Sequence, residues 1–202
     1  MPDTPGREAT VERTTKETAI AVTWNLDGRG QTNVETGIGM LDHMLEQLGK
    51  HGRFGLWVRA TGDLHVDAHH TIEDVGLALG QALNRALGDR AGIERMADRS
   101  VALDEALVQV VVDLSGRPYA SVDLRFSAPV VGALPTQMVA HLLESLAMEA
   151  RITLHVRQIS GDNDHHIMEA AFKALARALR DASRVHREWA GDVPSTKGTL
   201  TS

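Results

Sequence analysis

HMLEQL at residues 43–48 returns as HLLESL at residues 141–146, and the likeness continues into HHTIE at residues 69–73 and HHIME at residues 165–169. The register holds once a gap of two residues is allowed between the earlier and the later segments. Self-similarity at a long, fixed spacing indicates that one structural unit has been duplicated. This repeat decides how the rest of the chain is interpreted.

The likeness also extends upstream, where NLDGR at residues 25–29 resembles DLSGR at residues 113–117. A longer linker before the second histidine segment places an insertion around residues 126–137. The chain is therefore predicted to be a tandem duplication that forms one globular unit. It divides into a first half-domain at residues 10–90, a second at 98–184, and a C-terminal tail at 185–202.

Each repeat is predicted to run as strand, glycine turn, strand, helix, strand and helix. Helical spacing of apolar residues, or Ala- and Leu-rich runs without proline, predicts helices over residues 38–48, 72–87, 139–148 and 167–179. Runs of β-forming residues predict strands over 19–24, 55–60, 107–112 and 152–156. Asp27-Gly28 and Ser115-Gly116 have the chemistry of hairpin turns. The predicted class is α+β, with two sheets that carry helices.

The composition excludes several classes of function. With 21 basic and 27 acidic residues and a net charge of -6, sequence-independent nucleic-acid binding is not expected, because it needs clustered Lys and Arg. The absence of cysteine rules out disulfides, thiolate zinc sites and cysteine nucleophiles. No run approaches the roughly 20 apolar residues that span a bilayer. The opening MPDTPGREAT resembles neither a secretory signal nor a transit peptide, so we expect a cytoplasmic protein with no membrane partner.

The repeated His-His-x-x-Glu pattern is suited to metal binding. Residues four apart lie on the same face of a helix, so His69 with Glu73 is expected to hold one ion. By the same geometry, His165 with Glu169 is expected to hold a second ion. Both copies keep these residues although most other positions have diverged, which disfavours the alternative that the histidines serve only packing or the surface.

Four further histidines are expected to bind the same metal ions. His70 and His166 point about a quarter turn away from their neighbours, and are better placed to reach another ion than to share the first. His43 and His141 lead the two copies and complete the set of eight ligands. Imidazole and carboxylate ligands suit manganese, iron, zinc or cobalt, and the number of nitrogens disfavours calcium.

Four motifs in order carry a resemblance to a known family: GIGMLDHM from residue 37, DAHHTIED from 67, GDNDHHIMEA from 161 and PSTKG from 194. On these motifs the chain resembles imidazoleglycerol-phosphate dehydratase from about Arg13 to Lys197. The resemblance implies two half-domains, each a four-stranded sheet with helices packed on one face. It also implies a homo-oligomer of 24 subunits with active sites at subunit interfaces.

The implied reaction is the dehydration of D-erythro-imidazoleglycerol phosphate to imidazole-acetol phosphate plus water, in histidine biosynthesis. The resemblance implies two Mn²⁺ ions per active site, with the substrate held between them as imidazolate. Glu17 is the implied catalytic acid or base and a substrate contact, and its repeat counterpart Glu105 is a weaker candidate. The substrate phosphate needs cationic and hydroxyl donors, and the implied residues are Arg95, Arg117, Ser195, Thr196 and Lys197.

Two other functions also fit the metal constellation. A di-metal hydrolase would hold its ions about 3.5 to 4 Å apart, whereas an imidazole ring that bridges through both nitrogens needs roughly 6 Å. A non-catalytic metal-storage shell would need no phosphate pocket. The separation of the ions, and the effect of replacing Arg95 or Lys197 with alanine, would distinguish these possibilities.

Overall fold

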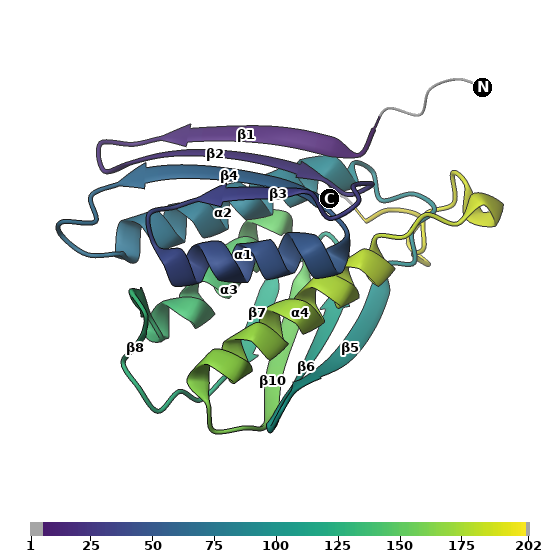
Figure 1. Ribbon diagram of the computed structural model, residues 1–202. Coiled ribbons are helices and arrows are strands. Elements are labelled where there is room, and N and C mark those ends of the chain that lie inside the picture. Colours follow the sequence, from purple (N-terminus) through teal and green to yellow (C-terminus); the bar gives the residue numbers. More distant parts are fainter. Residues whose placement is uncertain (1–5, 201–202) are drawn as a thin grey trace.

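The computed structural model describes residues 6–200 and contains two four-stranded sheets with four long helices between them (Figure 1). The first half consists of β1 (Glu8–Thr14), β2 (Thr18–Asn25), β3 (Thr32–Glu35), α1 (Gly39–Gly52), β4 (Gly55–Gly62) and α2 (His69–Leu87). The second half consists of β5 (Met96–Leu103), β6 (Ala106–Asp113), β7 (Tyr119–Asp123), β8 (Val130–Val131), β9 (Leu134–Pro135), α3 (Gln137–Ala150), β10 (Thr153–Ser160) and α4 (Asp164–Ala182). A short 3-10 helix, η1 (Arg187–Trp189), follows in the tail.

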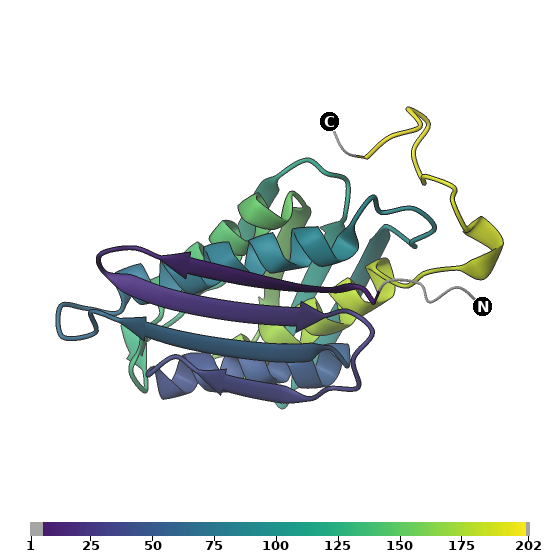
Figure 2. The same ribbon diagram turned by 90° about the horizontal axis from the view of Figure 1, so that it is seen from above.

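The two halves have the same sheet topology. The strand orders are β1-β2-β4-β3 and β5-β6-β10-β7, and in each sheet only the last pair is parallel. Helices cover one face of each sheet, as the view from above shows for the first half (Figure 2). The prediction of an α+β fold with two half-domains, each a four-stranded sheet carrying helices on one face, is confirmed.

The predicted hairpins at Asp27-Gly28 and Ser115-Gly116 are wrong. β2 is followed by β3 in the chain, but β4 lies between them in the sheet, so this turn leads to a crossover. Glycine is needed there for a different reason, because a Cβ on Gly28 would lie 2.0 Å from the backbone nitrogen of Gly55. The hairpins instead join β1 to β2 and β5 to β6.

The core lies between the sheets, where α2 packs on α3 and α1 packs on α4. The apolar stripes of the helices are buried, with Leu45 and Leu79 fully enclosed. Glycine on α2 lets the helices approach closely, since a Cβ on Gly80 would lie 2.5 Å from the carbonyl oxygen of Leu146. This packing brings the beginning of α2 beside α3, and the beginning of α4 beside α1.

The insertion predicted around residues 126–137 contains the small β8–β9 hairpin, and β9 packs against α1. The buried carboxylate of Asp164 holds the beginning of this insertion in place by accepting hydrogen bonds from the backbone of Ser127 and Ala128. The tail continues to Leu200, and its last two residues lie outside the described part. Within residues 6–200, no helix has both the length and the apolar character to cross a membrane.

Candidate functional site

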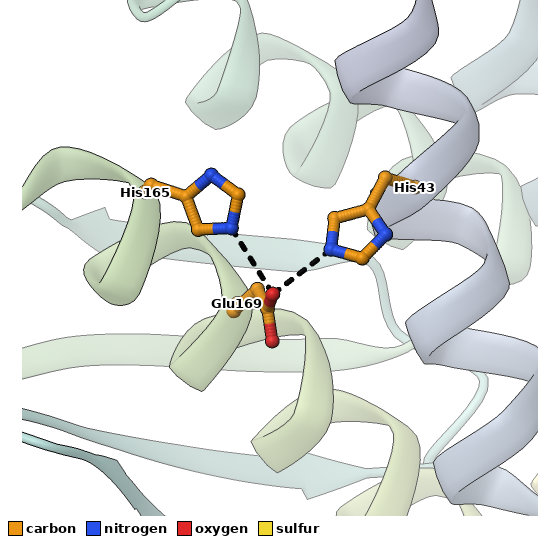
Figure 3. A group of neighbouring side chains, drawn as sticks. All are labelled: His43, His165 and Glu169. Carbon is orange, nitrogen blue, oxygen red and sulfur yellow. Dashed lines mark hydrogen bonds and ion pairs between the residues drawn. The ribbon is translucent and has the colours of Figure 1, made fainter.

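The first group of predicted ligands joins the beginning of α4 to α1 (Figure 3). The Oε1 atom of Glu169 lies 2.8 Å from Nε2 of His43 and 3.1 Å from Nε2 of His165. Asn163 caps α4 and accepts hydrogen bonds from the backbone N–H groups of His165 and His166. The four-residue spacing therefore places one imidazole and one carboxylate on the same face, and the other half-domain supplies the second imidazole.

The second group has the same composition and joins α2 to α3. Glu73 lies 3.7 Å from Nε2 of His69 through Oε2, and 3.6 Å from Nε2 of His141 through Oε1. The ring centroids of the two histidines are 5.1 Å apart. Asp67 accepts a hydrogen bond from the backbone of His69, as Asn163 does on α4. In both groups the ligand atoms lie within 4.8 Å of one another.

The chemistry of these groups fits a divalent transition metal. Each combines two imidazole nitrogens with a carboxylate, a donor set that such ions bind well. The Nε2 atom of His141 is buried and has no hydrogen-bond partner, although buried polar atoms are normally paired. A bound ion would satisfy that lone pair. Three protein ligands per group would also leave coordination positions open for a further ligand or a substrate.

The two groups differ in their electrostatics. Burial raises the pKa of Glu169, but the ammonium of Lys173 and the ring nitrogens of His43 and His165 outweigh it and lower that pKa to about 2. Lys173 contacts the Oε2 atom of Glu169 one helical turn along α4. The corresponding residue beyond Glu73 on α2 is Leu77. Sequence reasoning missed Lys173, because comparison of the repeats directs attention to what both copies share.

His70 and His166 do not join either group within this chain. The Nδ1 atom of His70 lies 3.0 Å from Asp63, and the Nδ1 atom of His166 lies 2.8 Å from Glu105. Among the described residues, neither Nε2 atom has a hydrogen-bond partner, and the carboxylate of Asp104 lies 3.9 Å from Nε2 of His166. In both rings Nδ1 is therefore bonded to a carboxylate, and Nε2 has no hydrogen-bond partner within residues 6–200.

The two repeat-related glutamates differ in their environment. Glu17 is exposed in the β1–β2 turn, and its negative charge contributes to raising the pKa of His70, after the larger effect of the Asp63 hydrogen bond. Glu105, in the β5–β6 turn, accepts from His166 and from the backbone of Asn163, and these bonds lower its pKa to about 2. The carboxylate of Glu105 is thus hydrogen-bonded, whereas the carboxylate of Glu17 makes no hydrogen bond within residues 6–200.

The five predicted phosphate contacts lie together around a cavity of about 470 Å³. Arg95 is held in place by a bidentate ion pair with Asp113, at 2.7 and 3.0 Å, and donates to the carbonyl of Pro194 at 2.6 Å. Gly116 lets the tail close over the cavity, because a Cβ there would overlap the carbonyl oxygen of Leu200. The lining residues are Arg95, Ser115, Arg117, Pro194, Ser195, Thr196, Lys197, Thr199 and Leu200.

The cavity lies far from the imidazole groups of the same chain. The backbone N–H of Arg95 donates to Ala182, the last residue of α4, whereas His165 lies in the first turn of that helix. At 1.5 Å per residue, these two ends are separated by about 25 Å along the axis. Figure 1 shows the tail at the opposite end of the molecule from the start of α4. One chain therefore carries both parts of the predicted site but does not bring them together.

Comparisons with known proteins show the family to which the chain belongs. Residues 36–179 match the family described as imidazoleglycerol-phosphate dehydratase. A relative with that name from Roseiflexus sp. (strain RS-1) is 55% identical over 194 residues, covering 96% of this chain and 98% of the relative. The solved structure of imidazoleglycerol-phosphate dehydratase from Staphylococcus aureus subsp. aureus N315 is similar with a TM-score of 0.80 and 34% identity, covering 89% of this chain and 99% of that chain.

A second solved structure, from Pyrococcus furiosus, is similar with a TM-score of 0.80 and 36% identity, covering 94% of this chain and 99% of that chain. Together with the fold and the paired groups, these matches make the chain a carbon-oxygen hydro-lyase built from two α+β repeats. It belongs to the imidazoleglycerol-phosphate dehydratase family, whose reaction is a dehydration in histidine biosynthesis.

Proposed function

We propose that this chain dehydrates D-erythro-imidazoleglycerol phosphate to imidazole-acetol phosphate plus water, with two Mn²⁺ ions in each active site. The requirement for metal is supported by the two groups of imidazoles and carboxylate, one of which contains a buried ring nitrogen with no hydrogen-bond partner. Bound ions would act as Lewis acids that hold the imidazole ring of the substrate as imidazolate. The eight proposed ligands are His43, His69, His70, Glu73, His141, His165, His166 and Glu169.

The remaining roles are assigned to residues of the chain by their chemistry. Glu17 has a free carboxylate that would take the carbon-bound proton, as a general base must. Arg95 and Lys197 would bind the substrate phosphate with Arg117, Ser195 and Thr196, because all five line one cavity. The ion pair with Asp113 holds the Arg95 guanidinium in a fixed orientation before the phosphate arrives.

We also infer that the active site is completed between subunits. The phosphate cavity and the group at His165 lie at opposite ends of α4, and a glycerol phosphate ester with one imidazole ring is too short to bridge about 25 Å. The Nε2 atoms of His70 and His166, whose rings are bonded only through Nδ1 to acidic side chains of this chain, would likewise be available to a neighbouring copy. Assembly into a homo-oligomer, with 24 subunits as the expected number, would supply these contacts. A cytoplasmic location is a prediction from the sequence.

Reconstitution of the metal-free protein tests this function. Addition of Mn²⁺ is expected to produce imidazole-acetol phosphate from imidazoleglycerol phosphate. Glu169→Gln should abolish turnover, because the variant loses a ligand charge, whereas the exposed Glu12→Gln should retain it. Verified loading with Mn²⁺ but no dehydration in the parent protein would contradict the proposal. Release of inorganic phosphate instead would support the di-metal hydrolase, and no reaction of any kind would support the storage shell.

A further inference from the structure

The two proposed histidine ligands that lie outside the two groups, His70 and His166, are held in the same way. An acidic side chain from a neighbouring loop contacts Nδ1 in each case: Asp63 at His70 and Glu105 at His166. We propose that Asp63 and Glu105 are positioning residues, which fix the tautomer and direction of these two rings so that each presents Nε2 to a metal ion. This inference rests on the proposed function, since it assigns the ions to that reaction.

The direction of the hydrogen bond determines which nitrogen is free. An ionised carboxylate can only accept, so the hydrogen of a neutral imidazole must reside on Nδ1, and the lone pair must then reside on Nε2. Histidines that bind metals commonly donate their other ring N–H to a carboxylate, which orients the ring and increases its basicity. The two contacts, at 3.0 and 2.8 Å, have this geometry.

The environment of Asp63 argues against a purely structural role. Its side chain is only 17% exposed, and its Oδ1 atom is buried with no hydrogen-bond partner. A buried acceptor without a partner destabilises the folded state. Its hydrogen bond to His70 accounts for only one of the two carboxylate oxygens. Asp63 therefore does not serve stability alone. Its single hydrogen bond to an imidazole is better explained by the orientation that it gives to the His70 ring.

The two carboxylates come from positions that are not equivalent in the repeat. Asp63 directly follows β4, and the residue that directly follows the corresponding strand β10 is Gly161. Glu105 lies in the β5–β6 turn, where the corresponding β1–β2 turn carries Glu17. Because Asp63 holds His70 in the first half, Glu17 is left free for proton transfer. In the second half the position of Asp63 is taken by Gly161, and Glu105 holds His166 instead.

Equilibrium Mn²⁺ binding to the full-length, metal-free protein tests this inference. Asp63→Asn and Glu105→Gln should each weaken binding of Mn²⁺ by about 10- to 100-fold, measured from the electron paramagnetic resonance signal of free Mn²⁺. Asp67→Asn, which removes the same charge nearby, and Glu12→Gln on the exposed face of β1 are the controls. Asn at position 67 keeps the helix cap, as Asn163 does on α4. Both controls, and Glu17→Gln, should bind Mn²⁺ like the parent.

Thermal unfolding of the metal-free variants separates positioning from stability. Each variant should unfold within a few degrees of the parent, and the conservative changes Asp63→Glu and Glu105→Asp should recover part of the lost affinity. Unchanged Mn²⁺ affinity in both Asp63→Asn and Glu105→Gln, or an equal loss in the controls, would overturn the inference. If Asp63→Asn does not fold, Glu105→Gln in its exposed turn decides alone. Failure of the parent to bind Mn²⁺ would instead count against the proposed function.

Discussion

Glu17 and Glu105 show at the scale of single residues how duplicated positions acquire different roles. They occupy corresponding hairpin turns, yet only Glu105 is bonded to a histidine. Comparison of the repeats pointed to the eight proposed ligands and to Glu105 as a weaker candidate than Glu17, because both copies keep those residues. It could not identify Asp63 or Lys173, since their counterparts in the other half, Gly161 and Leu77, carry no charge.

Glu17→Gln separates catalysis from metal binding. Glutamine keeps the size of the side chain but cannot accept the carbon-bound proton, so kcat should fall by about 10²- to 10⁴-fold. The affinity for Mn²⁺ should stay at the parent value, because Glu17 contacts neither group of ligands. Steady-state kinetics and Mn²⁺ titration on the same preparation provide the test. Retention of kcat within threefold would remove Glu17 as the base.

At the scale of elements, the sequence predicted what is buried better than what lies at an edge. The four helices and the strands β2, β4, β6 and β10 were all found, because their apolar residues are regularly spaced. β1 and β5 were not found from pattern, since edge strands exposed to solvent carry polar residues, as in EATVERT and MADRSVAL. These two strands complete the four-stranded sheets, which were expected only from the resemblance to the family.

The close contact of α2 with α3 predicts a strong effect of one methyl group. A Cβ on Gly80 would lie 2.5 Å from a carbonyl oxygen and 2.9 Å from the backbone nitrogen of Ala150. Gly80→Ala should therefore reduce the free energy of unfolding by about 1–3 kcal/mol, measured by urea denaturation. Gly39→Ala at the beginning of α1 meets no atom within 4 Å and is the matched control. Equal stability of the two variants would show that the helices are not in tight contact.

At the scale of the whole molecule, hydrogen bonds between the half-domains join the first half to the end of α4. Arg7 pairs with Asp27 in the first half and donates to the carbonyl of Ser183, just after α4. Arg180 on α4 donates to the carbonyl of Leu26 at 2.9 Å. Such contacts between distant segments could not be predicted from the sequence, because no periodic pattern specifies which charged side chain reaches across.

The Arg7–Asp27 pair predicts a small dependence of stability on pH. The hydrogen bond from Arg7 lowers the pKa of Asp27 below its usual 3.8, so the folded state binds the proton less readily than the unfolded state. The stabilisation is present above that value and is lost as the pH falls through the lowered pKa. Asp27→Asn should cost less than about 1 kcal/mol at pH 7, since the pair is partly exposed. The difference from the parent should disappear in acid; a difference that is constant with pH would contradict this.

The separation of the phosphate cavity from the imidazole groups implies that the active site is shared between subunits. The sequence predicted both sets of residues but not their distance within one chain, which depends on the length of α4. Glu169→Gln removes a proposed metal ligand, and Arg95→Ala removes a proposed phosphate contact. If neighbouring subunits complete the site, one variant can supply the part that the other has lost. Each variant should be inactive when assembled alone.

The most direct measurement is therefore dehydration of imidazoleglycerol phosphate by mixed assemblies of these two variants, loaded with Mn²⁺. Random mixing in equal amounts should restore about one quarter of the parent activity, because that share of interfaces combines an intact metal group with an intact phosphate cavity. Mixed assemblies verified by mass spectrometry that remain as inactive as the separate variants would contradict an active site shared between subunits.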